Sequence, residues 1–154
     1  MLVVDTSALV DAVIPVKGKE HRNELARQAI SSAESAGIPL AMPRLGGVVE
    51  TISLVKRLTG KDEAVALIEE YLSSRVLQVS EDWIFEDAKD VARKIHPRAA
   101  DAYFISTAKK FDAILISSDR DMVSRARKMG VKAFYILDEA ELEDFLKEVS
   151  GGAV

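Results

Sequence analysis

The sequence contains no cysteine and only two histidines, His21 and His96. Without cysteine the chain forms no disulfide, and it offers neither a thiolate metal ligand nor a cysteine nucleophile. Two histidines are also too few for a histidine-rich zinc centre. These absences exclude disulfide-stapled folds, thiol enzymes and the common classes of zinc site.

Long hydrophobic runs and an excess of positive charge are missing too. The apolar runs are far shorter than the roughly 18 residues that span a bilayer, and no basic region precedes the first one, as a secretory signal would require. We therefore expect a cytoplasmic protein. The net charge is −4, from 21 basic and 25 acidic residues. This balance argues against coating a duplex by charge alone, but not against a site where bound cations meet a phosphate.

The chain has 154 residues, of which 48% are hydrophobic, enough for one compact domain with a real core. No linker, repeat or low-complexity stretch divides it. We predict one domain over residues 1–149, followed by a frayed tail at residues 150–154.

Short apolar runs alternate with longer helical patterns. The strands are predicted at residues 2–4, 39–42, 76–79, 113–116 and 132–137. The helices are predicted from about residue 7 and at residues 19–36, 44–58, 61–74, 81–95, 99–111, 119–129 and 139–149. This order predicts an α/β protein, a three-layer α/β/α sandwich with a central parallel sheet of about five strands. The pair Gly46 and Gly47 is expected to delay the start of its helix.

Four acidic residues fall where such a sheet would bring them together. Asp5 directly follows the first strand, and Asp119 follows the fourth. Asp101 lies in the first turn of the helix before strand four. Glu50 lies about six residues into the helix after strand two, roughly 9 Å along its axis. Because ligands bind outside the carboxyl ends of parallel strands, we expect these four acids to share one site.

Each acid also has a purely structural explanation. Asp5 could cap the following helix, and Asp101 could be an acid favoured by the helix dipole. Asp119 and Asp121 fit an ordinary capping box, and Glu50 could lie on an exposed helix face. Individually these signals are weak, and only the predicted meeting point favours a functional reading.

Clustered carboxylates repel one another and take up protons unless a cation neutralises them. Hard oxygen ligands select Mg²⁺ or Mn²⁺ over softer metals. Such ions can bind a phosphodiester, lower the pKa of a bound water and stabilise a leaving oxygen. The acids therefore point to metal-dependent phosphodiester chemistry.

With these residues in view, the chain resembles PIN-domain nucleases, and specifically the stand-alone VapC-like toxins. The resemblance rests on residues 3–9 (VVDTSAL), 101–108 (DAYFISTA) and 114–122 (ILISSDRDM), in that order, with a helical acid between the first two. In that family the matching positions bind the divalent metal and carry catalysis, which implies those roles for Asp5, Glu50, Asp101 and Asp119. Asp121 matches a more variable acidic position, which implies a supporting metal ligand. The hydroxyls of Thr6, Ser7 and Ser117 resemble groups that orient these carboxylates, or they cap turns.

The resemblance implies a ribonuclease that cuts single-stranded or structured RNA with Mg²⁺ or Mn²⁺. It also implies a toxin held inactive by a small VapB-like antitoxin, and a homodimer. The helices at residues 44–58 and 61–74 supply either a dimer face or only the core. Trp83 is expected to anchor a helix start or the core rather than to stack on bases. The basic candidates for phosphate contacts are Arg44, Lys56, Arg57, Arg98, Arg120 and Arg125.

Other functions remain open at this point. A PIN scaffold that binds RNA or protein without cutting would keep the same acids, and so would a non-toxin RNA-processing nuclease. A signalling receiver needs an acidic pair after strand one, and only Asp5 is there. A haloacid dehalogenase phosphatase needs an aspartate two residues after Asp5, where Ser7 stands.

Overall fold

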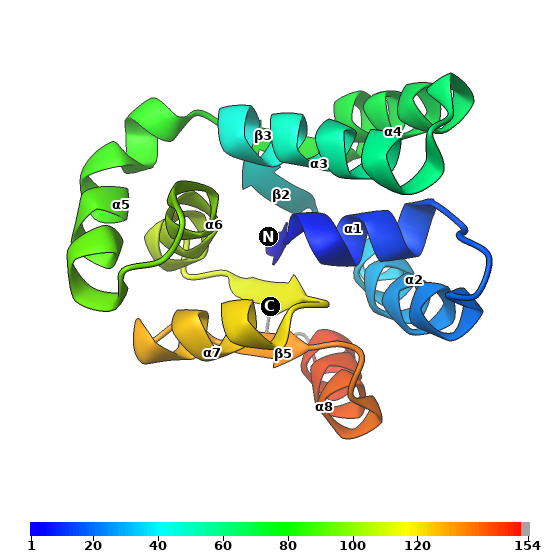
Figure 1. The fold of residues 1–154 in the computed structure, drawn as a ribbon. Helices are drawn as coiled ribbons and strands as arrows, with labels where there is room; N and C mark the ends of the chain where they lie inside the picture. The colour runs from blue at the N-terminus through cyan, green and yellow to red at the C-terminus, as the bar shows by residue number, and fades with distance from the viewer. Residues whose placement is uncertain (152–154) are drawn as a thin grey trace.

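A five-stranded sheet forms the centre of the structure, a computed structural model that describes residues 1–151 (Figure 1). The strands are β1 (Leu2–Val4), β2 (Leu40–Pro43), β3 (Val76–Val79), β4 (Ile114–Ser117) and β5 (Ala133–Tyr135). The helices are α1 (Thr6–Val13), α2 (Glu20–Ser35), α3 (Arg44–Thr59), α4 (Asp62–Arg75), α5 (Glu81–Ile95), α6 (Ala99–Lys110), α7 (Arg120–Lys128) and α8 (Glu139–Ser150).

The strand order is β3-β2-β1-β4-β5, and every neighbouring pair is parallel. The central strands β1 and β4 are buried along their whole length. This matches their apolar sequences, because strands covered on both faces carry no alternating polar side. The carboxyl ends of β1 and β4 therefore lie side by side in the middle of the sheet.

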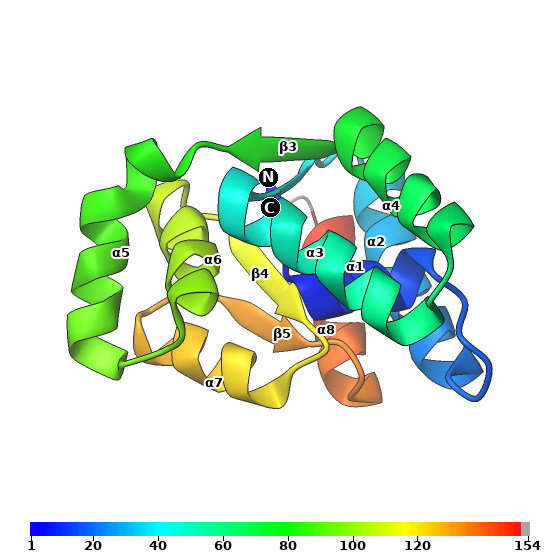
Figure 2. The same ribbon diagram turned by 45° about the horizontal axis from the view of Figure 1, so that its top comes forward.

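Helices cover both faces of this sheet (Figures 1 and 2). Helices α5, α6 and α7 lie on one side, and α1, α2, α4 and α8 lie on the other. Phe104 of α6 and Phe145 of α8 are fully buried. The predicted three-layer sandwich with a five-stranded parallel sheet is confirmed.

Helix α3 begins at Arg44, which agrees with the predicted range 44–58. Gly46 and Gly47 lie inside its first turn, so the delay expected from these two glycines is wrong. The buried carboxylate of Glu81 accepts hydrogen bonds from the backbone N–H groups of Leu45 (3.0 Å) and Gly46 (2.7 Å). A carboxylate at this point satisfies N–H groups that a helix start leaves unpaired, and it also complements the helix dipole. Glu81 belongs to α5, so it joins the starts of two helices.

Helix α8 continues through Ser150, one residue into the predicted tail, and residues 152–154 lie outside the described part of the chain. None of the helices in residues 1–151 has the length and hydrophobicity needed to cross a membrane.

Candidate active site

Four helix starts meet the carboxyl edge of the sheet, and each brings one of the predicted acids. Asp5 is the N-cap residue of α1, and Asp119 is the N-cap residue of α7. Asp101 lies in the first turn of α6. Glu50 lies in the second turn of α3.

Asp5 is buried, with 5% of its surface exposed, close to the 3% of Asp101. Its Oδ2 atom accepts hydrogen bonds from the hydroxyls of Ser117 (2.6 Å) and Ser7 (3.1 Å). Burial raises the pKa of Asp5 from 3.8 to about 7, against the lowering effect of the Ser117 hydroxyl. The charges of Glu50 and Asp101 contribute to this rise, after burial. Three acids from three segments are therefore close enough to repel one another electrostatically.

Asp101 is also buried, and two arginines hold it. Its Oδ2 atom lies 3.5 Å from Arg98 Nε and 3.3 Å from Arg125 Nη1. Burial raises the pKa of the Asp101 carboxyl, Arg98 and Arg125 oppose that rise, and the charge of Asp119 adds to it. The pKa of Arg98 is itself raised, first by Asp101 and also by Glu50 and Asp119. The negative charges of Asp101, Glu50 and Asp119 therefore all act on the Arg98 guanidinium.

One carboxylate oxygen of Asp119 caps the start of α7. Its Oδ1 atom accepts from the backbone N–H of Asp121 at 2.9 Å, and its own N–H donates to Ser117 Oγ at 2.9 Å. The capping role considered from the sequence is therefore real, and it leaves Oδ2 outside that hydrogen bond. The side chain of Asp121 is exposed on the first turn of α7.

The three hydroxyl residues near Asp5 divide into two groups. Ser7 and Ser117 both bond Asp5, and their Oγ atoms lie 3.3 Å apart. Thr6 instead faces α3, where its hydroxyl lies 3.3 Å from that of Thr51. Thr51, which the sequence did not single out, is fully buried and donates to the Gly47 carbonyl at 2.7 Å. The Thr6–Thr51 pair therefore ties α1 to the helix that carries Glu50.

The donor set fits a hard divalent cation in chemistry, because every candidate ligand is a carboxylate oxygen. Burial of mutually repelling acids also fits, since a cation would remove the repulsion. Within residues 1–151, however, no three acidic or histidine side chains already stand in ligating positions. A cation bound to Asp101 would compete with Arg98 and Arg125.

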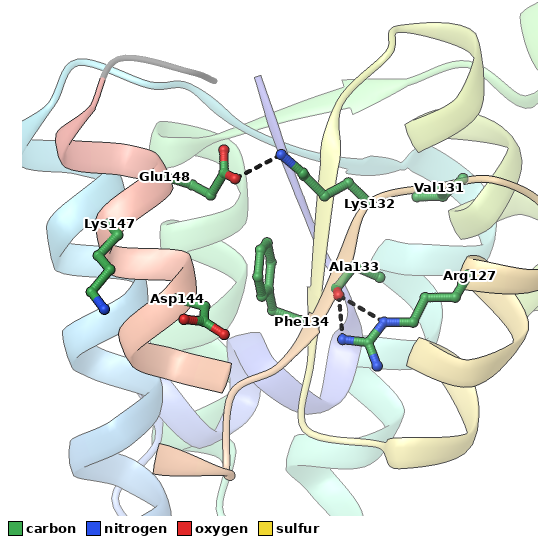
Figure 3. Close-up of a pocket in the computed structure, with 8 residues that line it drawn as sticks. All are labelled: Arg127, Val131, Lys132, Ala133, Phe134, Asp144, Lys147 and Glu148. Atoms are coloured by element: carbon green, nitrogen blue, oxygen red, sulfur yellow. Dashed lines mark hydrogen bonds and ion pairs between the residues drawn. The ribbon is translucent and has the colours of Figure 1, made fainter. Parts of the chain in front are cut away.

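Cavities elsewhere offer weaker candidates. One of about 630 Å³ lies between β5, α8 and the end of α7 (Figure 3). Its cations Arg127, Lys132 and Lys147 each pair with a glutamate, as with Lys132 and Glu148 at 2.7 Å. Because each of these three cations is paired with a glutamate, this cavity is a weaker candidate for a binding site than the acid cluster.

Comparison with known proteins agrees with this architecture. A family model described as the PIN domain matches residues 2–128. The chain belongs to the PIN-domain family. The match spans all four acids of this PIN domain, and the family resemblance predicted from the sequence is confirmed. No curated protein matches the chain.

Solved structures with low sequence identity share the fold. A FitAcB crystal structure from Neisseria gonorrhoeae is 20% identical, covers 87% of this chain and 96% of its own, and has a TM-score of 0.56. FitAB bound to an IR36 DNA fragment is 19% identical, with coverages of 90% and 96% and a TM-score of 0.61. VapC20 of Mycobacterium tuberculosis, described as a Sarcin-Ricin loop cleaving toxin, is 21% identical, with coverages of 80% and 94% and a TM-score of 0.61.

Proposed function

We propose that this PIN domain is a divalent-metal-dependent endoribonuclease that cuts single-stranded or structured RNA, with Asp5, Glu50, Asp101 and Asp119 as its metal-binding and catalytic residues. The observation that carries the proposal is geometric: Asp5, Asp101 and Asp119 lie at the starts of α1, α6 and α7, and the Ser117 hydroxyl bonds both the Asp5 carboxylate and the backbone N–H of Asp119. Asp121, exposed beside Asp119, is a supporting ligand.

In this proposal the protein supplies positioning and charge. Ser7 and Ser117 fix the orientation of the Asp5 carboxylate through its Oδ2 atom. When bound, Mg²⁺ or Mn²⁺ supplies Lewis-acid activation of the phosphodiester and of a water. Arg98 and Arg125 neutralise Asp101 in the free protein. Guanidinium groups suit phosphate oxygens, so Arg98 and Arg125 would be available to bind the substrate if a cation replaced them at Asp101.

We further propose that the protein is the toxin of a toxin–antitoxin pair, inhibited by a small VapB-like antitoxin. Support comes from the shared fold with VapC20 and with FitAB.

The proposed homodimer would use the outer faces of α3 and α4, where Leu45, Val49 and Leu67 are 64%, 66% and 48% exposed. Exposed apolar side chains of this size mark candidate interfaces. Light scattering that finds a monomer at micromolar concentration would reject the dimer.

The direct test is cleavage of labelled RNA by the purified protein with Mg²⁺ or Mn²⁺, compared with EDTA. Asp5→Asn and Asp101→Asn should abolish cleavage while the far-ultraviolet circular dichroism stays unchanged. Asp82→Asn is the matched control, because Asp82 is an exposed acid on α5. Full activity in both site variants would reject the assignment.

One observation favours a second candidate. Asp101 is held by two arginines and no three acids stand in ligating positions within the described residues. A PIN scaffold that binds RNA or protein without cutting could keep this arrangement. RNA binding without cleavage, in the presence of any of several divalent metals, would favour the scaffold.

A non-toxin RNA-processing nuclease would instead cleave RNA without arresting growth when expressed in a bacterial host.

A further inference from the structure

Helix α7 concentrates positive charge in a chain that is negative overall. Four of its nine residues are basic, namely Arg120, Arg125, Arg127 and Lys128, against one acid, Asp121. The net charge of the whole chain is −4. Because the helix begins directly after Asp119, this charge starts at the edge of the proposed active site.

The basic residues of α7 serve different faces. Arg125 points to Asp101, as described above. Arg120, Ser124 and Lys128 are spaced four residues apart, which places them in one row along the helix. This row is about 12 Å long at 1.5 Å per residue. All three of its side chains are exposed.

The row borders a cavity of about 390 Å³ between α7, β5 and the start of α8. Its walls include Arg120, Ser124, Arg127 and Lys128 of α7, Tyr135 of β5 and Glu141 of α8. The Arg120 guanidinium lies 4.8 Å from the centroid of the Tyr135 ring. Arg127 is not available to a ligand, because it bonds Glu141 and the Ala133 carbonyl in the cavity wall. Within residues 1–151, Arg120 and Lys128 make no ion pair, so both charges are available to a ligand.

The register of the sheet connects this groove to the acid cluster. Tyr135 pairs with Ser117 across the β4–β5 ladder. Ser117 is the residue whose hydroxyl donates to Asp5 at 2.6 Å. Neighbouring strands are about 4.8 Å apart, so the Arg120–Tyr135 pair lies one strand away from the side chains around Asp5.

We propose that the groove between α7 and β5 binds the single-stranded RNA segment on one side of the cleaved phosphate. Arg120 and Lys128 contact two phosphates, and Tyr135 with Arg120 forms a platform for a base. Positive charge along a groove combined with an aromatic stacking surface is the arrangement that single-stranded nucleic acid requires. This inference rests on the proposed nuclease function and adds the path of its substrate.

The test measures binding of a fluorescein-labelled ten-nucleotide RNA to the Asp5→Asn protein in EDTA, between 50 and 200 mM NaCl. Arg120→Ala with Lys128→Ala should weaken binding about tenfold and reduce the salt slope by about 1.4, since each phosphate contact on a single strand contributes about 0.7. Tyr135→Ala should weaken binding about fivefold, while Tyr135→Phe keeps the ring and the affinity. Lys17→Ala with Arg27→Ala removes the same charge from exposed positions outside the groove and should stay within about twofold of the parent.

Three outcomes would overturn the inference. If wild-type protein cleaves RNA but the groove variant binds RNA like the control, the groove proposal fails and the nuclease proposal stands. If the wild type neither binds nor cleaves RNA, the proposed function fails and the groove proposal falls with it. If a ten-residue glutamate peptide binds as tightly as the RNA and loses the same affinity in the groove variant, the surface is a general anion site.

Discussion

Ser117, the last residue of β4, donates a 2.6 Å hydrogen bond to Oδ2 of Asp5, the residue after β1, across 112 positions of sequence. The same Ser117 oxygen accepts the backbone N–H of Asp119 at 2.9 Å. One hydroxyl therefore sets the positions of two proposed metal ligands.

Replacement of Ser117 by alanine should weaken Mn²⁺ binding about tenfold, because partners that orient a ligand typically contribute 10- to 100-fold to metal affinity. The loss also removes the group that most strongly lowers the pKa of Asp5, so more of that carboxyl stays protonated. Isothermal titration calorimetry measures the affinity. Ser118→Ala is the matched control, since the buried Ser118 hydroxyl has no hydrogen-bond partner in the described structure. Equal affinities for the two variants would contradict the positioning role.

Asp5→Asn should stabilise the metal-free protein at pH 8, by up to about 4 kcal/mol, because the pKa of Asp5 is raised by about three units and each unit corresponds to 1.36 kcal/mol. The folded-state pKa of Asp5 is raised to about 7 from 3.8. Below pH 3.8 both states hold the proton and the carboxyl costs nothing. Between pH 3.8 and 7 the unfolded chain loses the proton first, so wild-type stability falls as the pH rises. Urea unfolding should show a large difference at pH 8 and one below about 1 kcal/mol at pH 4, and an equally large difference at pH 4 would contradict this explanation.

Glu81→Ala should lower the free energy of unfolding by about 2 kcal/mol, because a buried charged group that accepts two N–H groups is removed. The N–H groups of Leu45 and Gly46 lose their acceptor. Chemical denaturation measures the loss, with exposed Asp82→Ala as the control. If both variants unfold alike, Glu81 does not hold the start of α3.

The two glycines of α3 should respond oppositely to alanine. A Cβ at Gly46 would lie 3.6 Å from the Glu81 carboxylate, an ordinary contact. Gly46→Ala should therefore stabilise the protein by up to about 1 kcal/mol through helix propensity. A Cβ at Gly47 would lie 3.1 to 3.3 Å from three side-chain atoms of Met42. Gly47→Ala should destabilise the protein, as crowding in a packed core does. Thermal unfolding of the pair gives the comparison, and the same sign for both would contradict it.

The arrangement of strands and acids followed from local sequence and one rule of parallel sheets. The strands at residues 2–4 and 76–79 were predicted at their observed bounds. The first is apolar and buried throughout, whereas Leu77 and Gln78 of the second are exposed. The edge rule brought Asp5 and Asp119 to the same edge of the sheet without any knowledge of contacts, whereas the adjacency of their strands is known only from the structure. Local pattern and sheet geometry were sufficient to predict these strands and the edge of the sheet at which the acids lie.

Contacts between distant segments were not predictable in the same way. Gly46 and Gly47 suggested a late helix start because glycine is a poor helix former. The carboxylate that stabilises the observed early start belongs to Glu81, 36 positions from Leu45, so the local sequence does not indicate it. Trp83 was expected to anchor the core or a helix start, but its side chain is 69% exposed. The approach of Arg98 and Arg125 to Asp101 depends on the packing of α6 against its neighbours. Their basic character alone suggested only phosphate contacts.

Calorimetric titration of Mn²⁺ into the metal-free protein tests the central claim most directly. The wild type should bind the ion, and Asp5→Asn, Glu50→Gln, Asp101→Asn and Asp119→Asn should each weaken binding at least tenfold, with a smaller effect for Asp121→Asn and none for Asp82→Asn. Wild-type affinity indistinguishable from that of a variant lacking all four acids would contradict the account.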